Sequence, residues 1–184
     1  MKEFRTVRCD EITLEDVGKE VRIAGFVETI RDLGGVVFLD IRDMYGITQA
    51  VTSADSQDVD LASHIPIEST VTILGKVRKR SEDTINTKLK TGLVEVFIED
   101  IEILGKRTRN LPFEVNKDQE VREDLRLEYR FLDLRNEKLH NNILLRSKIL
   151  KTIRYKMDEL DFTEIQTPIL ANSSPEGARD YLVP

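Results

Sequence analysis

Short runs of alternating apolar and polar residues fill the first hundred positions, which is the pattern of β-strands with one buried face. The clearest run covers residues 36–42, where aliphatic residues alternate with Phe38, Asp40 and Arg42. A Phe that shares a strand face with Asp and Arg is either a core ring in a twisted or bulged strand, or a ring exposed for a ligand to stack on. The pattern alone leaves both interpretations of Phe38 open.

Four further strands are predicted over residues 21–30, 47–52, 70–80 and 94–104. Gly25 indicates a bulge or a bend in the first of them. Residues 13–18 have the capping and stop residues of a single helical turn, and residues 55–64 are compatible with a short helix. Five strands with a helix between the third and fourth suit a small closed all-β barrel of the OB type. Such barrels bind oligonucleotides or oligosaccharides on the face of strands two and three.

The pattern changes after residue 104. Residues 105–121 lack periodicity and read as a linker, followed by a short helix over 123–132 and a longer amphipathic helix over 136–160. A strand is predicted over residues 163–167, where Pro168 stops it. One long helix and one strand cannot close a core. We therefore predict three parts: a barrel domain at 1–104, a linker or hinge at 105–135, and an incomplete α+β domain at 136–184.

Composition narrows the possible functions. The chain has a single cysteine and two distant histidines, so a disulfide, a histidine-based metal site and a Ser-His-Asp triad are disfavoured, and a reducing cytoplasm is expected. No apolar run is long enough to span a bilayer. The net charge of −6 argues against nucleic acid. However, the basic run at residues 76–80 could bind a phosphate backbone locally or simply protect an edge strand.

Six segments of the chain give a more specific indication. They are RDLGGVVFLDIRD at 31–43, YGITQ at 45–49, GKVRKR at 75–80, YRFLDLR at 129–135, FTEIQTPIL at 162–170 and SSPEGARDYLVP at 173–184. In this order they resemble the N-terminal third of a bacterial-type aspartyl-tRNA synthetase, a class II enzyme. The resemblance covers an anticodon-binding OB domain and the opening of the catalytic domain.

The resemblance implies a set of residues that bind the tRNA anticodon. It places the base-stacking ring at Phe38 and further contacts at Arg31, Gln49, Arg78 and Glu95. The chemistry of these side chains suits the roles, because an aromatic ring offers any base a π-face, and Gln and Glu can discriminate base edges.

The basic run would supply the cations of this interface. Lys76, Arg78 and Arg80 recur at every second position, so we expect them to share one strand face and to neutralise phosphates.

In the second part, the resemblance implies that the long helix and following strand are motif 1, the dimer interface of the family. Glu176 matches the position that binds the ammonium group of the substrate aspartate. Family members activate L-aspartate with ATP and Mg²⁺ and transfer it to aspartate tRNA, using motifs 2 and 3. Those motifs find no match here, so we expect no catalytic residue and no metal ligand within the chain, which should bind tRNA without charging it. Homodimerisation is expected of the full-length family and stays open for this chain.

Two departures from the family pattern alter the expectation. Residues 26–30 lack the arginines that often precede RDLG, so phosphate contacts should be weaker. Leu33 stands where some relatives that also charge asparagine tRNA carry His, which hints at restriction to aspartate tRNA. The alternative function is a stand-alone OB-fold module that binds nucleic acid and recruits a partner through its helical tail.

Overall fold

The computed structural model describes residues 4–116 and 121–169. The chain divides into two compact units, Met1–Asn110 and Leu111–Pro184, and each is described by itself.

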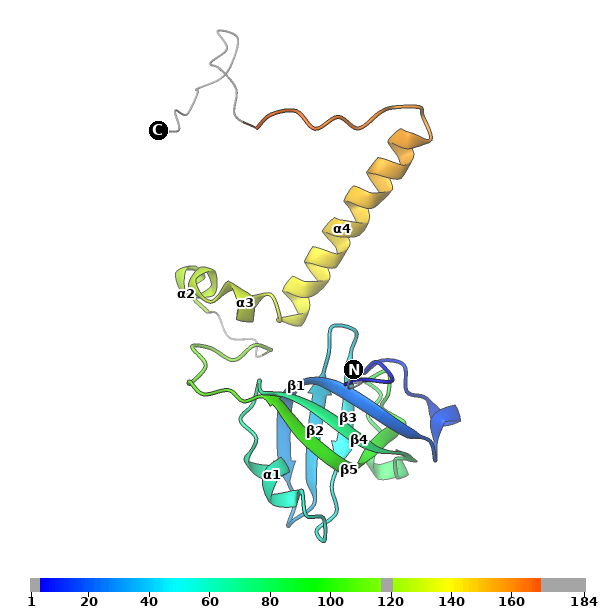
Figure 1. The fold of residues 1–184 in the computed structure, drawn as a ribbon, viewed down its shortest axis with the longest axis vertical. Helices are drawn as coiled ribbons and strands as arrows, with labels where there is room; N and C mark the ends of the chain where they lie inside the picture. Colours follow the sequence, from blue (N-terminus) through cyan, green and yellow to red (C-terminus); the bar gives the residue numbers. More distant parts are fainter. Residues whose placement is uncertain (1–3, 117–120, 170–184) are drawn as a thin grey trace. The chain divides into compact units, whose positions relative to one another are not determined.

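The first unit is a closed five-stranded barrel (Figure 1). Its strands are β1 (Glu20–Asp32), β2 (Val37–Arg42), β3 (Ile47–Val51), β4 (Thr70–Lys79) and β5 (Val94–Gly105), joined around the barrel in the order β1-β2-β3-β5-β4. All neighbours are antiparallel except β3 and β5, which run parallel. The helix α1 (Val59–His64) lies between β3 and β4 in the chain, and two 3-10 helices cover Leu14–Asp16 and Glu82–Thr84. The predicted OB-type barrel is confirmed.

The barrel core consists of the aliphatic positions that alternate along each strand. Val37, Leu39 and Ile41 of β2 are fully buried, as are Ile23 and Val27 of β1. Phe38 is therefore on the outer face of β2, where it is half-buried, and it is not a core ring.

Two glycines allow the barrel to close. A Cβ atom at Gly25 would lie 2.4 Å from the carbonyl oxygen of Arg42, and one at Gly75 would lie 2.2 Å from the carbonyl oxygen of Phe97. Gly25 thus permits close approach of two strands, whereas the irregularity in the β1–β2 pairing falls between Val27 and Thr29. Gly25, where a bulge or a bend was expected, is therefore a point of close contact between strands. The bulge itself lies slightly further along β1.

One buried cation of the barrel, Arg42, is paired with two carboxylates. The guanidinium of Arg42 forms ion pairs with Glu28 at 3.1 Å and with Glu68 at 2.7 Å. Cys9 is fully buried, and this burial raises the pKa of its thiol above the ordinary value. A thiol in this environment is a small core side chain and is unsuited to act as a nucleophile.

The second unit contains α2 (Glu123–Glu128), α3 (Arg130–Asp133) and α4 (Glu137–Asp158). The predicted helix at 123–132 is broken at Tyr129, whose φ of −106° and ψ of 45° are not helical. The long helix begins close to its predicted start because the Asn136 side chain accepts the Leu139 N–H and caps it. Apart from the half-buried Leu139, its apolar residues are exposed: Ile143, Leu144, Leu145, Ile149, Leu150, Ile153, Tyr155 and Met157.

The prediction of a strand at residues 163–167 is wrong. Residues 162–168 are extended coil, and Phe162 and Ile165 are 61% and 77% exposed. A strand requires a neighbour that completes its hydrogen bonds, and no strand in the described part of the second unit provides one. Glu176 lies outside the described residues.

Candidate nucleic-acid interface

Pairing between strands aligns two rows of side chains across the outer face of the barrel. Residues directly opposite in a ladder share a face, so the register identifies each row. We call the first the Phe38 row; it contains Arg31, Phe38, Val51, Phe97 and Lys76. The second, the Gln49 row, contains Thr29, Asp40, Gln49, Glu95 and Arg78. All five predicted anticodon-binding residues of the barrel are in these rows.

Hydrogen bonds connect the two rows into one network. The Nη2 atom of Arg31 donates to the two carboxylate oxygens of Asp40 at 3.1 and 3.2 Å, and to Oε1 of Gln49 at 3.1 Å. The Nε2 atom of Gln49 in turn donates to Glu95 at 3.0 Å. Thr29 donates its hydroxyl to Asp40 at 2.5 Å. The Gln49 amide is consequently fixed at both ends, with its oxygen towards a cation and its nitrogen towards a carboxylate.

Two aromatic rings occupy the Phe38 row. Phe38 lies directly opposite Arg31 on β1 and Val51 on β3, and it is half-buried. Phe97 lies opposite Val51 from the other side, and the guanidinium carbon of Arg78 is 3.4 Å from its ring centroid. Val51 between them is only 6% exposed although it faces outwards. The centre of this face is therefore largely apolar, and charged groups border it.

The expectation that Arg80 shares the basic face with Lys76 and Arg78 is wrong. Strand β4 ends at Lys79, and Arg80 turns inwards until it is 4% exposed. It donates to the carbonyl oxygens of Val94 at 2.9 Å and Thr84 at 3.3 Å. Burial lowers the pKa of this guanidinium from its ordinary value. Lys76 and Arg78 are exposed as predicted, while Arg80 serves the barrel structure.

Four members of the rows were missed from the sequence: Thr29, Asp40, Val51 and Phe97. Asp40 and Phe97 alternate with core residues and so stand on the outer faces of β2 and β5, which was visible in the pattern. What the pattern did not contain is the register that brings Asp40 opposite Gln49 and Phe97 opposite Val51. Thr29 follows the bulge, where alternation along β1 shifts.

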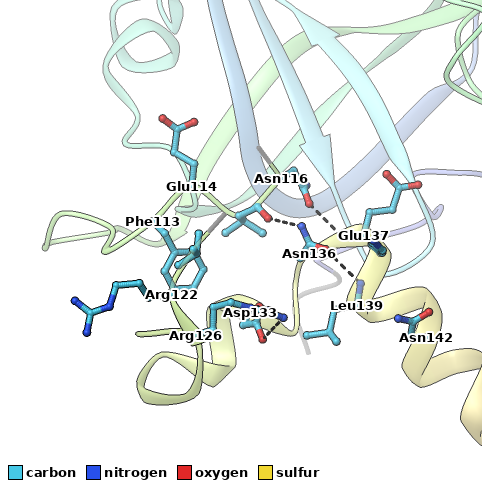
Figure 2. Close-up of a pocket in the computed structure, with 13 residues that line it drawn as sticks. Phe113, Glu114, Asn116, Arg122, Arg126, Asp133, Asn136, Glu137, Leu139 and Asn142 are labelled. Carbon is cyan, nitrogen blue, oxygen red and sulfur yellow. Dashed lines mark hydrogen bonds and ion pairs between the residues drawn. The ribbon is translucent and has the colours of Figure 1, made fainter. Parts of the chain in front are cut away.

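The second unit has a separate cleft of about 740 Å³ (Figure 2). The Asn136 side chain donates to the carbonyl of Val115 at 2.8 Å, and Asn116 accepts the backbone N–H of Glu137 at 3.1 Å. Asp133, which is 4% exposed, pairs with Arg126 at 2.8 Å. The bonds of Asn136 and Asn116 hold the start of α4 against residues 115–116, and the Asp133–Arg126 pair joins α3 to α2, so these polar groups have structural roles.

The described ranges, 4–116 and 121–169, contain no group of three His, Cys, Asp or Glu side chains that could hold a metal ion. None of the helices in those ranges is long and apolar enough to cross a membrane.

Two protein families match the chain, one in each unit. The family described as "OB-fold nucleic acid binding domain" matches residues 21–104, and "tRNA synthetases class II (D, K and N)" matches residues 122–184. An aspartate–tRNA(Asp/Asn) ligase from Rickettsia canadensis is 51% identical over the whole chain, and one from Dinoroseobacter shibae is equally similar. The chain belongs to the class II aspartyl-tRNA synthetase family. It corresponds to the N-terminal region of these synthetases and spans 31% of the length of the two curated relatives.

Solved synthetase structures have the same fold. A putative aspartyl-tRNA synthetase from Leishmania major aligns over 94% of the chain and 37% of its own, with a TM-score of 0.83 and 26% identity. An asparaginyl-tRNA synthetase from Pyrococcus horikoshii aligns over 95% of the chain and 39% of its own, with a TM-score of 0.80 and 28% identity. Because these alignments include both units, they favour a synthetase region over a stand-alone OB-fold module.

The relatives also bear on Leu33. The names of the ligases from Rickettsia canadensis and Dinoroseobacter shibae include the tRNAs of both aspartate and asparagine, so these two relatives lend no support to the restriction suggested by Leu33. In the structure Leu33 is 70% exposed in the turn after β1, two residues from Arg31.

Proposed function

We propose that the two rows bind the anticodon loop of an aspartate tRNA, and that the chain is the anticodon-binding and hinge region of an aspartate–tRNA ligase. The observation that carries this proposal is the fixed Gln49 amide between Arg31 and Glu95, next to the partly exposed ring of Phe38. Single-stranded loops are recognised by stacking on rings and by hydrogen bonds to base edges, and this face offers both.

Each row has a distinct part in the proposed interface. Phe38 stacks on one unpaired base. Gln49 and Glu95 read the edge of a base, because the amide retains one N–H and one lone pair and the carboxylate accepts from amino groups. Arg31, which is half-exposed, and Lys76 attract the phosphates.

The remaining steps of aminoacylation belong to the longer proteins of the family. We propose that residues 1–104 form the anticodon domain, 105–135 the hinge and 136–184 the start of the catalytic domain. Glu176 would bind the substrate ammonium, and the exposed apolar residues of α4 would be covered in a cytoplasmic homodimer of the full-length enzyme. ATP and Mg²⁺ would be bound by other parts of that enzyme, so the chain alone should support no aspartate-dependent exchange of pyrophosphate with ATP.

Binding of an anticodon stem-loop RNA tests the proposal. The 184-residue chain should bind the aspartate stem-loop more tightly than one with a scrambled loop, measured by fluorescence anisotropy at two salt concentrations. Phe38→Ala should raise Kd for the aspartate stem-loop about 5- to 150-fold, from a stacking contribution of about 1–3 kcal/mol per base. Phe4→Ala removes a half-exposed ring outside both rows and should leave Kd unchanged.

Equal affinity for the aspartate and scrambled loops would overturn the proposal. A parallel titration with an asparagine stem-loop tests the role of Leu33. Equal binding of the aspartate and asparagine loops would assign the chain to both tRNAs.

A further inference from the structure

We propose that Phe97 and Arg78 form a second stacking site for a nucleobase on the same barrel face as Phe38. The inference deepens the proposed anticodon-binding function and rests on it. It gives Phe97 a binding role and changes that of Arg78 from a phosphate contact to a planar stacking surface.

The position of the Arg78 guanidinium is the first observation. Its central carbon lies 3.4 Å from the Phe97 ring centroid, close to the thickness of a ring and well within cation–π distance. Glu95 is directly opposite Arg78 in the β4–β5 ladder, where an ion pair across the strands would be ordinary. Glu95 instead accepts the hydrogen bond from Gln49.

The second observation is that the polar groups of Arg78 are not used by the described part of the protein. Within residues 4–116 and 121–169, Arg78 makes no hydrogen bond or ion pair, and its side chain is exposed. One face of the guanidinium lies against Phe97, and the residue as a whole is exposed. Its N–H donors are not used by the described protein. Arginine planes stack on bases as aromatic rings do, and their edges can donate to base or phosphate oxygens at the same time.

The spacing between the two rings suits a loop with unstacked bases. Phe38 and Phe97 are both opposite Val51, on the strands at either side of β3. Two strand spacings place the rings about 10 Å apart. That separation is about three times the rise of about 3.4 Å between stacked bases, so each ring would receive a different, splayed base. Lys76, opposite Phe97, lies at the outer end of this row and can contact the connecting phosphate.

Substitutions that separate charge from planarity test the proposal. Arg78→Lys keeps the charge and loses the plane, so it should raise Kd for the aspartate stem-loop at least 5-fold without changing the slope of log Kd against log salt. Phe97→Leu keeps an apolar residue in the strand but removes the ring that supports the Arg78 guanidinium. It should therefore raise Kd by a similar factor. Lys76→Gln is the matched control. It should reduce the salt slope by about 0.7, the value for one phosphate contact to a single strand.

A fluorescent base reports stacking directly. Stem-loops with 2-aminopurine at each loop position in turn should show two positions quenched on binding, one released by Phe38→Ala and the other by Arg78→Lys. An Arg78→Lys variant with wild-type Kd and wild-type quenching would overturn the inference while leaving the anticodon proposal intact. Absence of stem-loop binding by the unaltered chain would overturn both. Thermal melting of Arg78→Lys, whose side chain is exposed, should match that of the unaltered chain and so exclude misfolding as the cause.

Discussion

Replacing Asp40 by Asn should reduce discrimination between anticodon loops and leave the barrel stable. Asp40 contacts no base in our proposal and acts as a positioning residue. Its carboxylate holds Nη2 of Arg31 at 3.1 and 3.2 Å, and the same Nη2 atom donates to Oε1 of Gln49 at 3.1 Å. Asp40→Asn removes the charge that keeps the guanidinium beside the amide, so the orientation of Gln49 would depend on Glu95 alone.

The two effects of Asp40→Asn have different magnitudes. Arg31 is 52% exposed, and an ion pair of this kind contributes about 0–1 kcal/mol to stability, so the melting temperature should fall by no more than about 5 °C. A hydrogen bond to a charged group contributes about 1.5 kcal/mol or more, and 1.4 kcal/mol is a factor of ten. Loss of the bond from Arg31 to Gln49 should therefore make the wrong amide orientation about ten times more accessible.

Anisotropy titrations with a cognate stem-loop and with loops substituted at single bases measure this effect. For each substituted loop we take the ratio of its Kd to the Kd of the cognate loop. We expect Asp40→Asn to lower this ratio about tenfold when the substituted base is the one read by Gln49, and to leave it constant for the other bases. Asp100→Asn makes the same charge change at an exposed β5 position about 17 Å along the strand from Glu95, and should alter no ratio. An equal loss of affinity for every loop, with all ratios unchanged, would show that Asp40 does not act through Gln49.

Two further predictions concern the interior of the barrel and one concerns its charge. Arg42→Met removes the cation shared by Glu28 and Glu68 and should lower the free energy of unfolding by about 3 kcal/mol in urea titrations; a loss below about 1 kcal/mol would refute the argument. Because the pKa of Cys9 is raised from 9.0, the folded state keeps a proton that the unfolded state loses. The stability difference between the unaltered chain and Cys9→Ala should thus be constant below pH 9 and fall by about 1.4 kcal/mol per pH unit above it. Lys76→Gln should weaken binding equally for all RNA loops, and a change in their ranking would contradict a phosphate contact.

Local patterns were sufficient to predict most elements of the chain. Alternation along β2 predicted which side chains fill the core, since only one face of an antiparallel strand in a small barrel can be buried. The helical spacing of apolar residues predicted α4, and the structure shows that Asn136 caps its start. Residues 163–167 have an equally strand-like composition and form coil, because pairing depends on a neighbouring strand that local sequence does not specify.

The interface was harder to predict because its central strand does not alternate. In β3 the outward Gln49 and Val51 are almost as buried as the inward Thr48 and Ala50, so polar and apolar positions are mixed. The register explains this burial: Val51 lies between two aromatic neighbours, and the Gln49 amide is enclosed by Arg31 and Glu95. Because water is excluded from the centre of this outer face, the strand there lacks the alternation of apolar and polar residues that a solvated face produces. The same property favours a nucleobase there, since stacking and hydrogen bonds to a base edge gain strength where little water competes.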